Sequence, residues 1–271
     1  MDTHLFFFSG TGNSYRIAGM IKEQLTGKVT LTGLQSVTKP LKVTAERVGF
    51  VVPVYFVTIP RVVLKSIQRI RFEGVRYSFG VVTCGGVAGN ALADLQTVLR
   101  KGGVDLSSGR VIYMPDSSIF HCSSEKNKKA MLGQYVQQVR EFCGVIIQRK
   151  ENMSGLKPKR IFRIIGAVTR PALLQLLGAS RKQAETGCTG CGMCSAFCPA
   201  GNIAMRNGKP VFGIHCMDCF GCVHWCPDKA IRFGFMKINE KNRWRHPEVT
   251  MQELAGYNSR KKISDNAVVE G

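Results

Sequence analysis

Eight of the eleven cysteines fall into two runs with identical spacing. The first run reads C-x2-C-x2-C-x3-C-P over residues 188–199, and the second repeats it over residues 216–227, 28 positions later. Ile203 and Ile231 keep the same offset, so the repeat extends beyond the cysteines. Three closely spaced thiolates followed by a Cys-Pro pair are the spacing of sites that bind two iron–sulfur clusters. The chemistry expected of this stretch is one-electron transfer.

The ligand sets follow from the reach of each run. Three thiolates on one tight loop can bind three irons of a cubane, so the fourth ligand must come from the other run. The predicted ligands of one 4Fe-4S cluster are Cys188, Cys191, Cys194 and Cys226. Those of the second are Cys216, Cys219, Cys222 and Cys198. Zinc prefers ligands in two pairs, and disulfides suit secreted chains, so both alternatives fit this spacing less well. His215 and His224 adjoin the cysteines and are expected beside the ligands or at the surface.

These runs resemble the bacterial-type two-cluster ferredoxins, over about residues 181–240. The resemblance implies a small α+β domain around the two clusters. Asn207-Gly208 lies between two short apolar segments and predicts a hairpin. Residues 230–233 predict the matching strand in the second repeat.

A second candidate site lies near the amino terminus. The apolar run Thr3–Phe8 predicts a buried strand, and the apolar spacing of Tyr15–Leu25 predicts a helix. Between them stand Ser9, Gly10, Thr11, Gly12, Asn13 and Ser14. A hydroxyl- and glycine-rich turn at a helix amino terminus gathers backbone N–H groups and suits a phosphate. The turn has no lysine and no G-x-G-x-x-G pattern, so it matches neither a Walker loop nor a dinucleotide fingerprint.

This hexapeptide resembles the phosphate loop of the flavodoxin family, which has the form S/T-x-T-G-N-S/T. The resemblance implies FMN, with two further loops around its ring system. The matching residues here are Pro53, Val54, Tyr55 and Phe56 after one strand, and Thr83, Cys84, Gly85, Gly86 and Asn90 after the next. Tyr55 or Phe56 would stack on the ring. The later loop lacks the aromatic residue common in flavodoxins, so one ring face would be open to a substrate or to the iron–sulfur domain.

The rest of the first 150 residues alternates strands and helices, as a doubly wound α/β parallel sheet requires. Further strands are predicted at 28–31, 48–53, 77–84 and 109–114, and helices at 60–70, 89–100 and 125–148. In such sheets a ligand binds beyond the carboxyl ends of the strands, where the three loops would meet. Cys84 would then lie beside the flavin, as an unpaired buried thiol rather than a redox group.

Four segments are expected along the chain. Residues 1–150 form the flavodoxin-like domain, 151–180 a helical linker, 181–240 the ferredoxin domain and 241–271 a polar tail. Three arginines interrupt the apolar residues of the linker, and Pro171 divides it into two short helices. We expect these helices to pack between the domains rather than to lie on a membrane surface.

Composition and charge restrict the setting and the partners. Hydrophobic residues make up 44% of the chain, enough for a sizeable core. The net charge of +20 favours encounter with an acidic redox partner, although a merely basic surface explains it equally well, and no nucleic-acid recognition motif accompanies it. The sequence shows neither a signal peptide nor an apolar run that could span a membrane, which predicts a cytoplasmic protein. Cys84, Cys122 and Cys143 are then free thiols.

The whole chain resembles the flavodoxin–ferredoxin fusion proteins of anaerobic bacteria. That resemblance implies an electron carrier that relays electrons between two 4Fe-4S clusters and FMN. An FMN-dependent reductase of a small substrate is the alternative, and a ferredoxin with an interaction domain that lost FMN is a third. The sequence offers no clear proton donor beside the flavin, which favours the carrier, whereas the open ring face favours the reductase.

Overall fold

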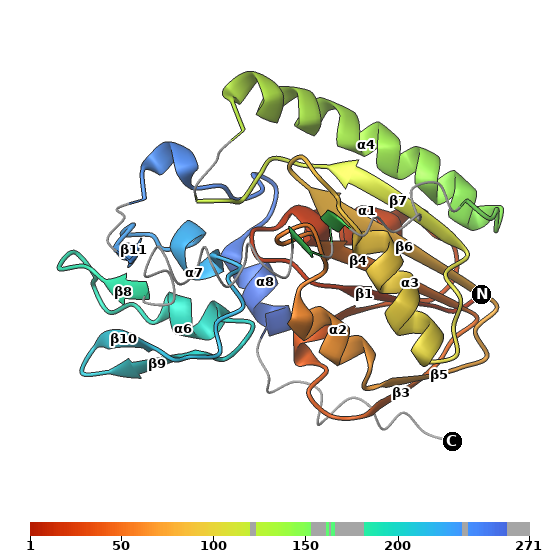
Figure 1. Cartoon of the computed structure of the whole chain (residues 1–271), viewed down its shortest axis with the longest axis horizontal. Helices are drawn as coiled ribbons and strands as arrows, with labels where there is room; N and C mark the ends of the chain where they lie inside the picture. Colours follow the sequence, from red (N-terminus) through yellow and green to blue (C-terminus); the bar gives the residue numbers. More distant parts are fainter. Residues whose placement is uncertain (120–122, 153–160, 163, 166–181, 235–237, 259–271) are drawn as a thin grey trace.

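The structure is a computed structural model, which describes residues 1–119, 123–152, 161–162, 164–165, 182–234 and 238–258 (Figure 1). A five-stranded sheet in the order β2-β1-β4-β6-β7 forms the framework of the first half. Its strands are β1 (Thr3–Phe7), β2 (Val29–Gly33), β4 (Arg47–Pro53), β6 (Tyr77–Cys84) and β7 (Ser108–Tyr113). All neighbouring pairs are parallel. Counted among themselves these strands run 2-1-3-4-5, the flavodoxin-like order, so the predicted doubly wound fold is confirmed.

Helices cover both faces of this sheet (Figure 1). They are α1 (Asn13–Gln24), α2 (Arg61–Ile67), α3 (Ala91–Lys101) and α4 (Glu125–Ile147). Because successive side chains of a strand point to opposite faces, Leu5 and Phe7 join the core beneath α1 and α4. Phe6 and Phe8 join the core beneath α2 and α3. Both faces are buried, which explains why β1, β4 and β6 have mainly apolar sequences.

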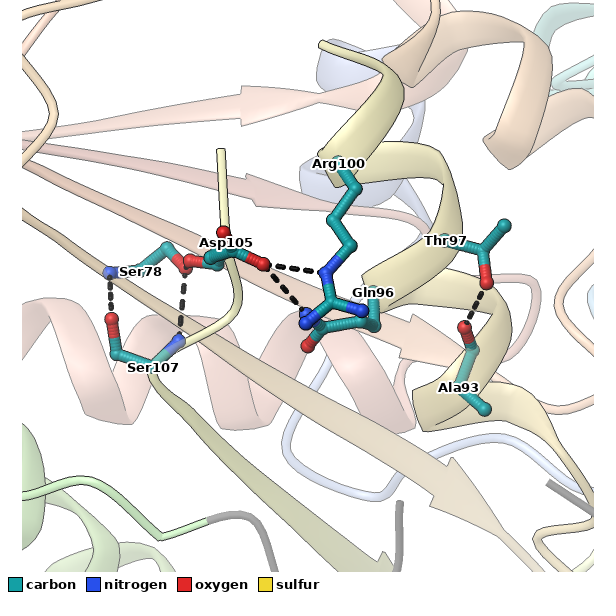
Figure 2. A network of polar contacts seen from close by, with 7 residues as sticks. All are labelled: Ser78, Ala93, Gln96, Thr97, Arg100, Asp105 and Ser107. Carbon is teal, nitrogen blue, oxygen red and sulfur yellow. Dashed lines mark hydrogen bonds and ion pairs between the residues drawn. The ribbon is translucent and has the colours of Figure 1, made fainter. Parts of the chain in front are cut away.

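A polar network fixes α3 against the edge of the sheet (Figure 2). The carboxylate of Asp105 accepts hydrogen bonds from Gln96 Nε2 at 3.0 Å and from Arg100 Nε at 2.5 Å. Ser78 Oγ donates to the carbonyl of Asp105, and Ser78 N donates to Ser107 Oγ at 3.2 Å. The turn from α3 to β7 is therefore tied to α3 and to β6, and this fixes the end of α3 opposite the candidate site.

One part of the first half differs from the prediction. The helix expected over residues 60–70 ends at Ile67, and β5 (Ile70–Glu73) follows it. β5 pairs in parallel with β3 (Leu41–Thr44) in a separate two-stranded sheet. Both strands have four residues, too few for a period of two to stand out in the sequence. The other predicted elements are present, with bounds that differ by a few residues.

The second half contains two small antiparallel sheets. One pairs β9 (Ile203–Arg206) with β10 (Lys209–Phe212), and the other pairs β8 (Lys182–Ala184) with β11 (Ile231–Phe233). Asn207 and Gly208 join β9 to β10 with φ angles of 49° and 70°, as the predicted Asn-Gly turn requires. Two short helices, α6 (Met193–Phe197) and α7 (Gly221–His224), complete this α+β unit. The arrangement is consistent with the predicted ferredoxin-like domain.

The segment after residue 240 differs from the polar tail that the sequence predicts. It forms a short turn, η2 (Glu240–Asn242), and then α8 (Met251–Asn258). Leu254 is fully buried in the core under α1 and α4, together with Val249 and Met251. Tyr257 accepts a hydrogen bond at its carbonyl from Gln35, in η1 (Leu34–Ser36), at 3.1 Å. A few apolar side chains spaced through a polar segment are enough to dock it on the sheet domain.

Most of the predicted linker lies outside the described residues, so its two helices stay a prediction. Among the helices that the structure describes, none is long and apolar enough to cross a membrane.

Candidate functional site

The eight cysteines of the two runs line two separate cavities. Cys188, Cys191, Cys194 and Cys226 line the first, together with Gly190, Pro210 and Ile231. Cys198, Cys216, Cys219 and Cys222 line the second, together with Lys182 and Phe220. Each cavity thus takes three cysteines from one run and the last from the other, as the assignment of ligands expects. Cys191 is exposed, whereas Cys219 and Cys222 are buried, so the second cavity is the more enclosed.

Backbone amides approach the cysteine sulfurs. Asn202 N lies 3.2 Å from Cys198 Sγ, and the matching Ala230 N lies 3.4 Å from Cys226 Sγ. Asp218 N lies 3.4 Å from Cys216 Sγ. Such donors stabilise negative sulfur, and they tune the potential of a cluster bound there. Among the described residues, no group of three or more His, Cys, Asp or Glu side chains is arranged to hold a single metal ion.

Lys182 is the functional candidate that the sequence reasoning missed. Its ammonium is buried beside the second cavity, 2.8 Å from Cys216 Sγ and 3.4 Å from Asp218 Oδ1. Burial acts to lower the pKa of Lys182, but the sulfurs of Cys216 and Cys222 and the carboxylate of Asp218 raise it above its ordinary value. The internal repeat offered a signal for Lys182. It lies 28 residues before Pro210, so the two residues hold equivalent positions in the repeat, and Pro210 lines the first cavity.

The predicted phosphate loop closes tightly before α1. Gly12 has a φ of 99°, and its N–H donates to Ser9 Oγ at 3.0 Å. Asn13 Nδ2 donates to the carbonyl of Pro115 at 3.0 Å, and the hydroxyls of Ser14 and Thr83 lie 2.8 Å apart. The side chains of Ser9, Asn13 and Ser14 are therefore each fixed by a hydrogen bond within the loop or to a residue near the end of a neighbouring strand. A turn of this kind at a helix amino terminus is suited to an anion.

The three loops predicted to surround a flavin meet in a polar pocket at the carboxyl ends of the strands. Its lining consists of Ser9, Gly10, Thr11, Asn13, Ser14, Pro53, Val54, Tyr55, Thr83, Cys84, Gly85, Pro115, Asp116 and Ser117. The loop after β7, residues 115–117, was missed. The rule that ligands bind at the carboxyl ends of parallel strands could have found it, because β7 ends there too. Asn90 is buried at the start of α3 and does not line the pocket.

A larger cavity of about 290 Å³ adjoins this pocket. It shares Val54, Tyr55, Cys84, Gly85, Asp116 and Ser117 with the pocket and adds Phe56 and Gly86. Val57, Val87 and Ser118 also line it, and residues 218–220 of the cysteine region complete its wall. Cys219 therefore lines both this cavity and the second cysteine cavity. The side of the loops that lacks an aromatic residue is thus covered by the other half of the chain.

Tyr55 lies where these parts meet. A Cβ atom on Gly10 would lie 2.7 Å from Tyr55 Oη and 2.9 Å from the carbonyl oxygen of Cys219. Burial, and the neighbouring Cys219, raise the pKa of Tyr55 well above its usual value, so the hydroxyl keeps its proton. Phe56 has a φ of 51°, a conformation that non-glycine residues seldom adopt and that is concentrated at functional sites. Stacking on a flavin by either residue stays a prediction.

Several hydrogen bonds join the phosphate loop and its neighbours to the second half. Trp225 Nε1 donates to the carbonyl of Gly10 at 3.0 Å, and Trp244 Nε1 donates to Asn13 Oδ1 at 3.0 Å. His246 N donates to the carbonyl of Thr11 at 2.8 Å. His224 Nε2 lies 2.8 Å from the carbonyl of Ser117, and burial lowers the pKa of His224 to about 4. The two halves are thus held in register around the shared cavity.

Cys84 and Cys143 fit no reactive role. Burial raises the pKa of Cys84 to about 11, and that of Cys143 to about 11 as well. Both are therefore protonated thiols at neutral pH. His121 and Cys122 lie outside the described residues.

Comparison with known proteins identifies one region of the chain. Residues 181–227 match the family model of the 4Fe-4S dicluster domain. No curated protein gave a significant match to the chain. The second half therefore contains an iron–sulfur domain, in the region where the cysteine runs lie.

Solved structures resemble the sheet domain only distantly. An FMN-dependent NADH-azoreductase from Bacillus anthracis in complex with FMN is 11% identical, with a TM-score of 0.38; the match covers 54% of this chain and 100% of that one. An azoreductase from Bacillus anthracis str. Sterne is 13% identical over 53% of this chain and 99% of its own, with a TM-score of 0.37. Rubredoxin oxygen:oxidoreductase from Desulfovibrio gigas is 13% identical, with a TM-score of 0.32, over 52% of this chain and 36% of its own. At these levels of identity and TM-score the likeness carries no argument. The fold assignment rests on the strand order described above.

Proposed function

We propose that this chain is an electron-transfer flavo-iron–sulfur protein, which relays electrons between two 4Fe-4S clusters and FMN. The observation that carries the proposal is the position of Cys219, which lines both the second cysteine cavity and the cavity beside the phosphate pocket. Clusters pass single electrons and flavin accepts one or two, so their combination on one chain converts between the two electron counts.

The residues present fit the groups proposed. Each cysteine cavity offers four sulfurs, with backbone amides directed at the sulfurs. The pocket at the carboxyl ends of the strands offers neutral hydroxyls and a helix amino terminus to a phosphate monoester. The adjoining cavity offers Tyr55, Phe56 and the backbone around Gly85 to a flat ring system. Ser9, Thr11, Asn13 and Ser14 would hold the phosphate end.

The arrangement gives the relay an order. Cys191, in the first cavity, is exposed, so that end of the iron–sulfur domain is the one open to a protein partner. The second cavity is enclosed and borders the flavin cavity through residues 218–220. We propose that a redox protein, acidic in view of the net charge of +20, exchanges electrons at the first cluster.

The test begins with cofactor content. Protein purified anaerobically without added cofactors should contain about eight irons per chain and bound FMN. With a limiting reduced ferredoxin as electron donor, flavin reduction observed by stopped-flow absorbance should require intact clusters. Four irons or fewer after full reconstitution would contradict the two clusters, and cluster-replete protein that binds no FMN would instead support the ferredoxin with an interaction domain.

A reductase of a small substrate is the second candidate. One observation favours it, since Asp116 and the protonated hydroxyl of Tyr55 line the cavity beside the flavin pocket. Such groups can hold a proton where a reduced flavin delivers electrons. Steady-state turnover with reduced ferredoxin and a panel of small acceptors separates the two candidates, because a carrier passes electrons only to redox proteins.

A further inference from the structure

The internal repeat allows the two cysteine cavities to be compared position by position. An offset of 28 residues relates Cys188 to Cys216 and Phe197 to Trp225. The same offset relates Lys182 to Pro210 and Asp218 to Gly190. Lys182 lines the second cavity, and Pro210 and Gly190 line the first. A buried ion pair thus stands in one half of the repeat where the other half has two uncharged residues.

The surroundings of Lys182 hold its charge next to one cysteine sulfur. Lys182 is 5% exposed and Asp218 is 6% exposed, so neither charge is solvated by bulk water. The ammonium bonds Cys216 Sγ at 2.8 Å and Asp218 Oδ1 at 3.4 Å. It also lies over the rings of Phe220, at 5.1 Å, and Phe233, at 5.0 Å. Two aromatic faces and a carboxylate confine a cation that would otherwise leave the interior.

The first cavity has a lysine of a different kind. Lys209 is exposed, and its Nζ bonds the carbonyl oxygen of Cys188 at 2.5 Å rather than a sulfur. Water screens a charge at such a position. Among the residues that the structure describes, only those of the second cavity therefore combine a desolvated cation with a direct bond to a predicted ligand sulfur.

We propose that Lys182, held by Asp218, raises the reduction potential of the cluster bound by Cys198, Cys216, Cys219 and Cys222 relative to the cluster in the other repeat. The proposal rests on the proposed function, since it requires both clusters. When a low-potential carrier donates one electron, the receiving cluster gains one unit of negative charge. A desolvated cation at its sulfur stabilises that charge strongly, because the local dielectric is low. Burial alone would have the opposite effect, since it disfavours added charge.

The consequence for the relay is a bias toward the flavin. The more enclosed cluster borders the cavity beside the phosphate pocket through residues 218–220. If burial were uncompensated, an electron would remain on the exposed cluster, near the partner that delivered it. Lys182 offsets the burial and draws the electron to the cluster from which the flavin can receive it.

The experiment is a redox titration of cluster-replete protein under anaerobic conditions, followed by EPR. Lys182→Met keeps the length of the side chain and removes its charge. It should lower the midpoint potential of one cluster only, with at least about a tenfold loss in its equilibrium share of the electron, or about 59 mV. Lys209→Met is the matched control at the first cavity and should leave both potentials nearly unchanged. Equal shifts in the two variants, or no shift in Lys182→Met, would overturn the proposal.

Asp218→Asn is an independent test, because it should shift the midpoint potential in the opposite direction. It retains the cation and removes the counter-charge, so the potential of the same cluster should rise. This sign separates an electrostatic role from a structural one, because a packing defect has no reason to reverse direction between the two variants. If Lys182→Met fails to retain its clusters, an unchanged or lowered potential in Asp218→Asn still overturns the proposal.

Iron and sulfide content separate this failure from failure of the proposed function. Wild-type protein that cannot bind two clusters would contradict the relay itself. Two bound clusters whose potentials do not change in Lys182→Met and Asp218→Asn would contradict only the proposed effect of Lys182 on the potential.

Discussion

The two halves of the chain build their sites in different ways. The sheet domain positions its loops on strands of five to eight residues, with a core on each face of the sheet. The iron–sulfur domain has strands of three or four residues and a small core around Phe220, Val223 and Phe233. A unit with so little buried apolar surface needs another source of stability. In the first half the fold creates the site, whereas in the second we expect the proposed clusters to supply much of the folding energy.

The two halves of the chain also share one hydrophobic core. Phe197 and Trp225, which are equivalent in the repeat, both belong to the core under α1 and α4 rather than to the small core. The iron–sulfur domain is therefore attached to the sheet domain by the aromatic residue just before each distal cysteine. Packing at these two positions allows the sheet domain to stabilise the cysteine region.

The largest expected effect comes from removing one cysteine of the second cavity. Cys219→Ala should lose about half of the iron, because three sulfurs hold a 4Fe-4S cluster poorly. Backbone amides around the second cavity should lose hydrogen-exchange protection, while those of β4 and β6 remain protected, because the sheet has its own cores. Exchange measured by mass spectrometry, together with iron content, gives both readings.

Cys143→Ala is the control for this variant. Cys143 lies on the buried face of α4 in the sheet domain, so its removal should leave the iron content unchanged. If β4 and β6 lost as much hydrogen-exchange protection in Cys219→Ala as the cysteine region does, the two halves would form one cooperative unit. The contrast between them drawn above would then be wrong.

The second prediction concerns the loop that the halves share. Gly10→Ala would place a methyl group 2.7 Å from Tyr55 Oη and 2.9 Å from the carbonyl oxygen of Cys219, and that backbone atom cannot move aside cheaply. We expect the free energy of unfolding to fall by about 2–3 kcal/mol. FMN affinity should fall by at least about tenfold, measured by fluorescence titration, because the pocket must deform.

Gly19→Ala provides the matched substitution on α1. No atom lies within 4 Å of the added carbon, so this variant should be neutral or slightly stabilising in the helix. Similar losses in the two variants would mean that Gly10 is not confined between Tyr55 and Cys219.

The sequence was informative where a local pattern determines the structure. Two strands covered on both faces, β4 and β6, appear as mainly apolar runs, and the cysteine spacing alone separates the eight thiols into the two sets that the cavities contain. Asn207-Gly208 likewise has a single common turn conformation. These features require no knowledge of what lies nearby in space.

The features that were missed depend on segments far apart in the chain. Trp225 and Trp244 bond Gly10 and Asn13 across more than two hundred residues, and no local period marks such a contact. The docking of α8 through Leu254 escaped notice because its neighbours are polar and charged. β3 and β5 escaped because each is a four-residue strand with a distant partner. Lys182 differs from these cases, since comparison of the two repeats could have identified it.

The third prediction tests the junction by pH. His246 is buried between the phosphate loop and α4, with its ring against Tyr135 and with Glu248 and Arg16 nearby. Burial lowers the pKa of His246 to about 4. The unfolded chain takes up a proton at the ordinary pKa near 6.5, so the contribution of His246 is complete above about pH 6.5 and is lost as the pH falls toward 4.

Between pH 7 and pH 5 the loss assigned to His246 should be about 1–2 kcal/mol, measured by urea unfolding. His246→Asn can still accept from the amide of Glu248 and does not titrate, so its stability should fall less over the same interval. Parallel pH profiles for the two proteins would show that His246 is not held neutral by the fold.

The smallest effect separates the two indole bonds that join the halves. Trp225→Phe retains the buried ring and removes the donor to the carbonyl of Gly10, so it should cost about 1 kcal/mol of unfolding free energy. Trp244→Phe removes a bond of the same length to Asn13, but Trp244 is half-buried and water can replace it, so we expect a smaller cost. Because Gly10 is also next to Cys219, only Trp225→Phe should alter the rate of flavin reduction in stopped-flow experiments. An equal change of rate in both variants would mean that the bonds merely hold the halves together. A change of rate confined to Trp225→Phe would instead indicate that the contact between Gly10 and the cysteine region is part of the electron-transfer path.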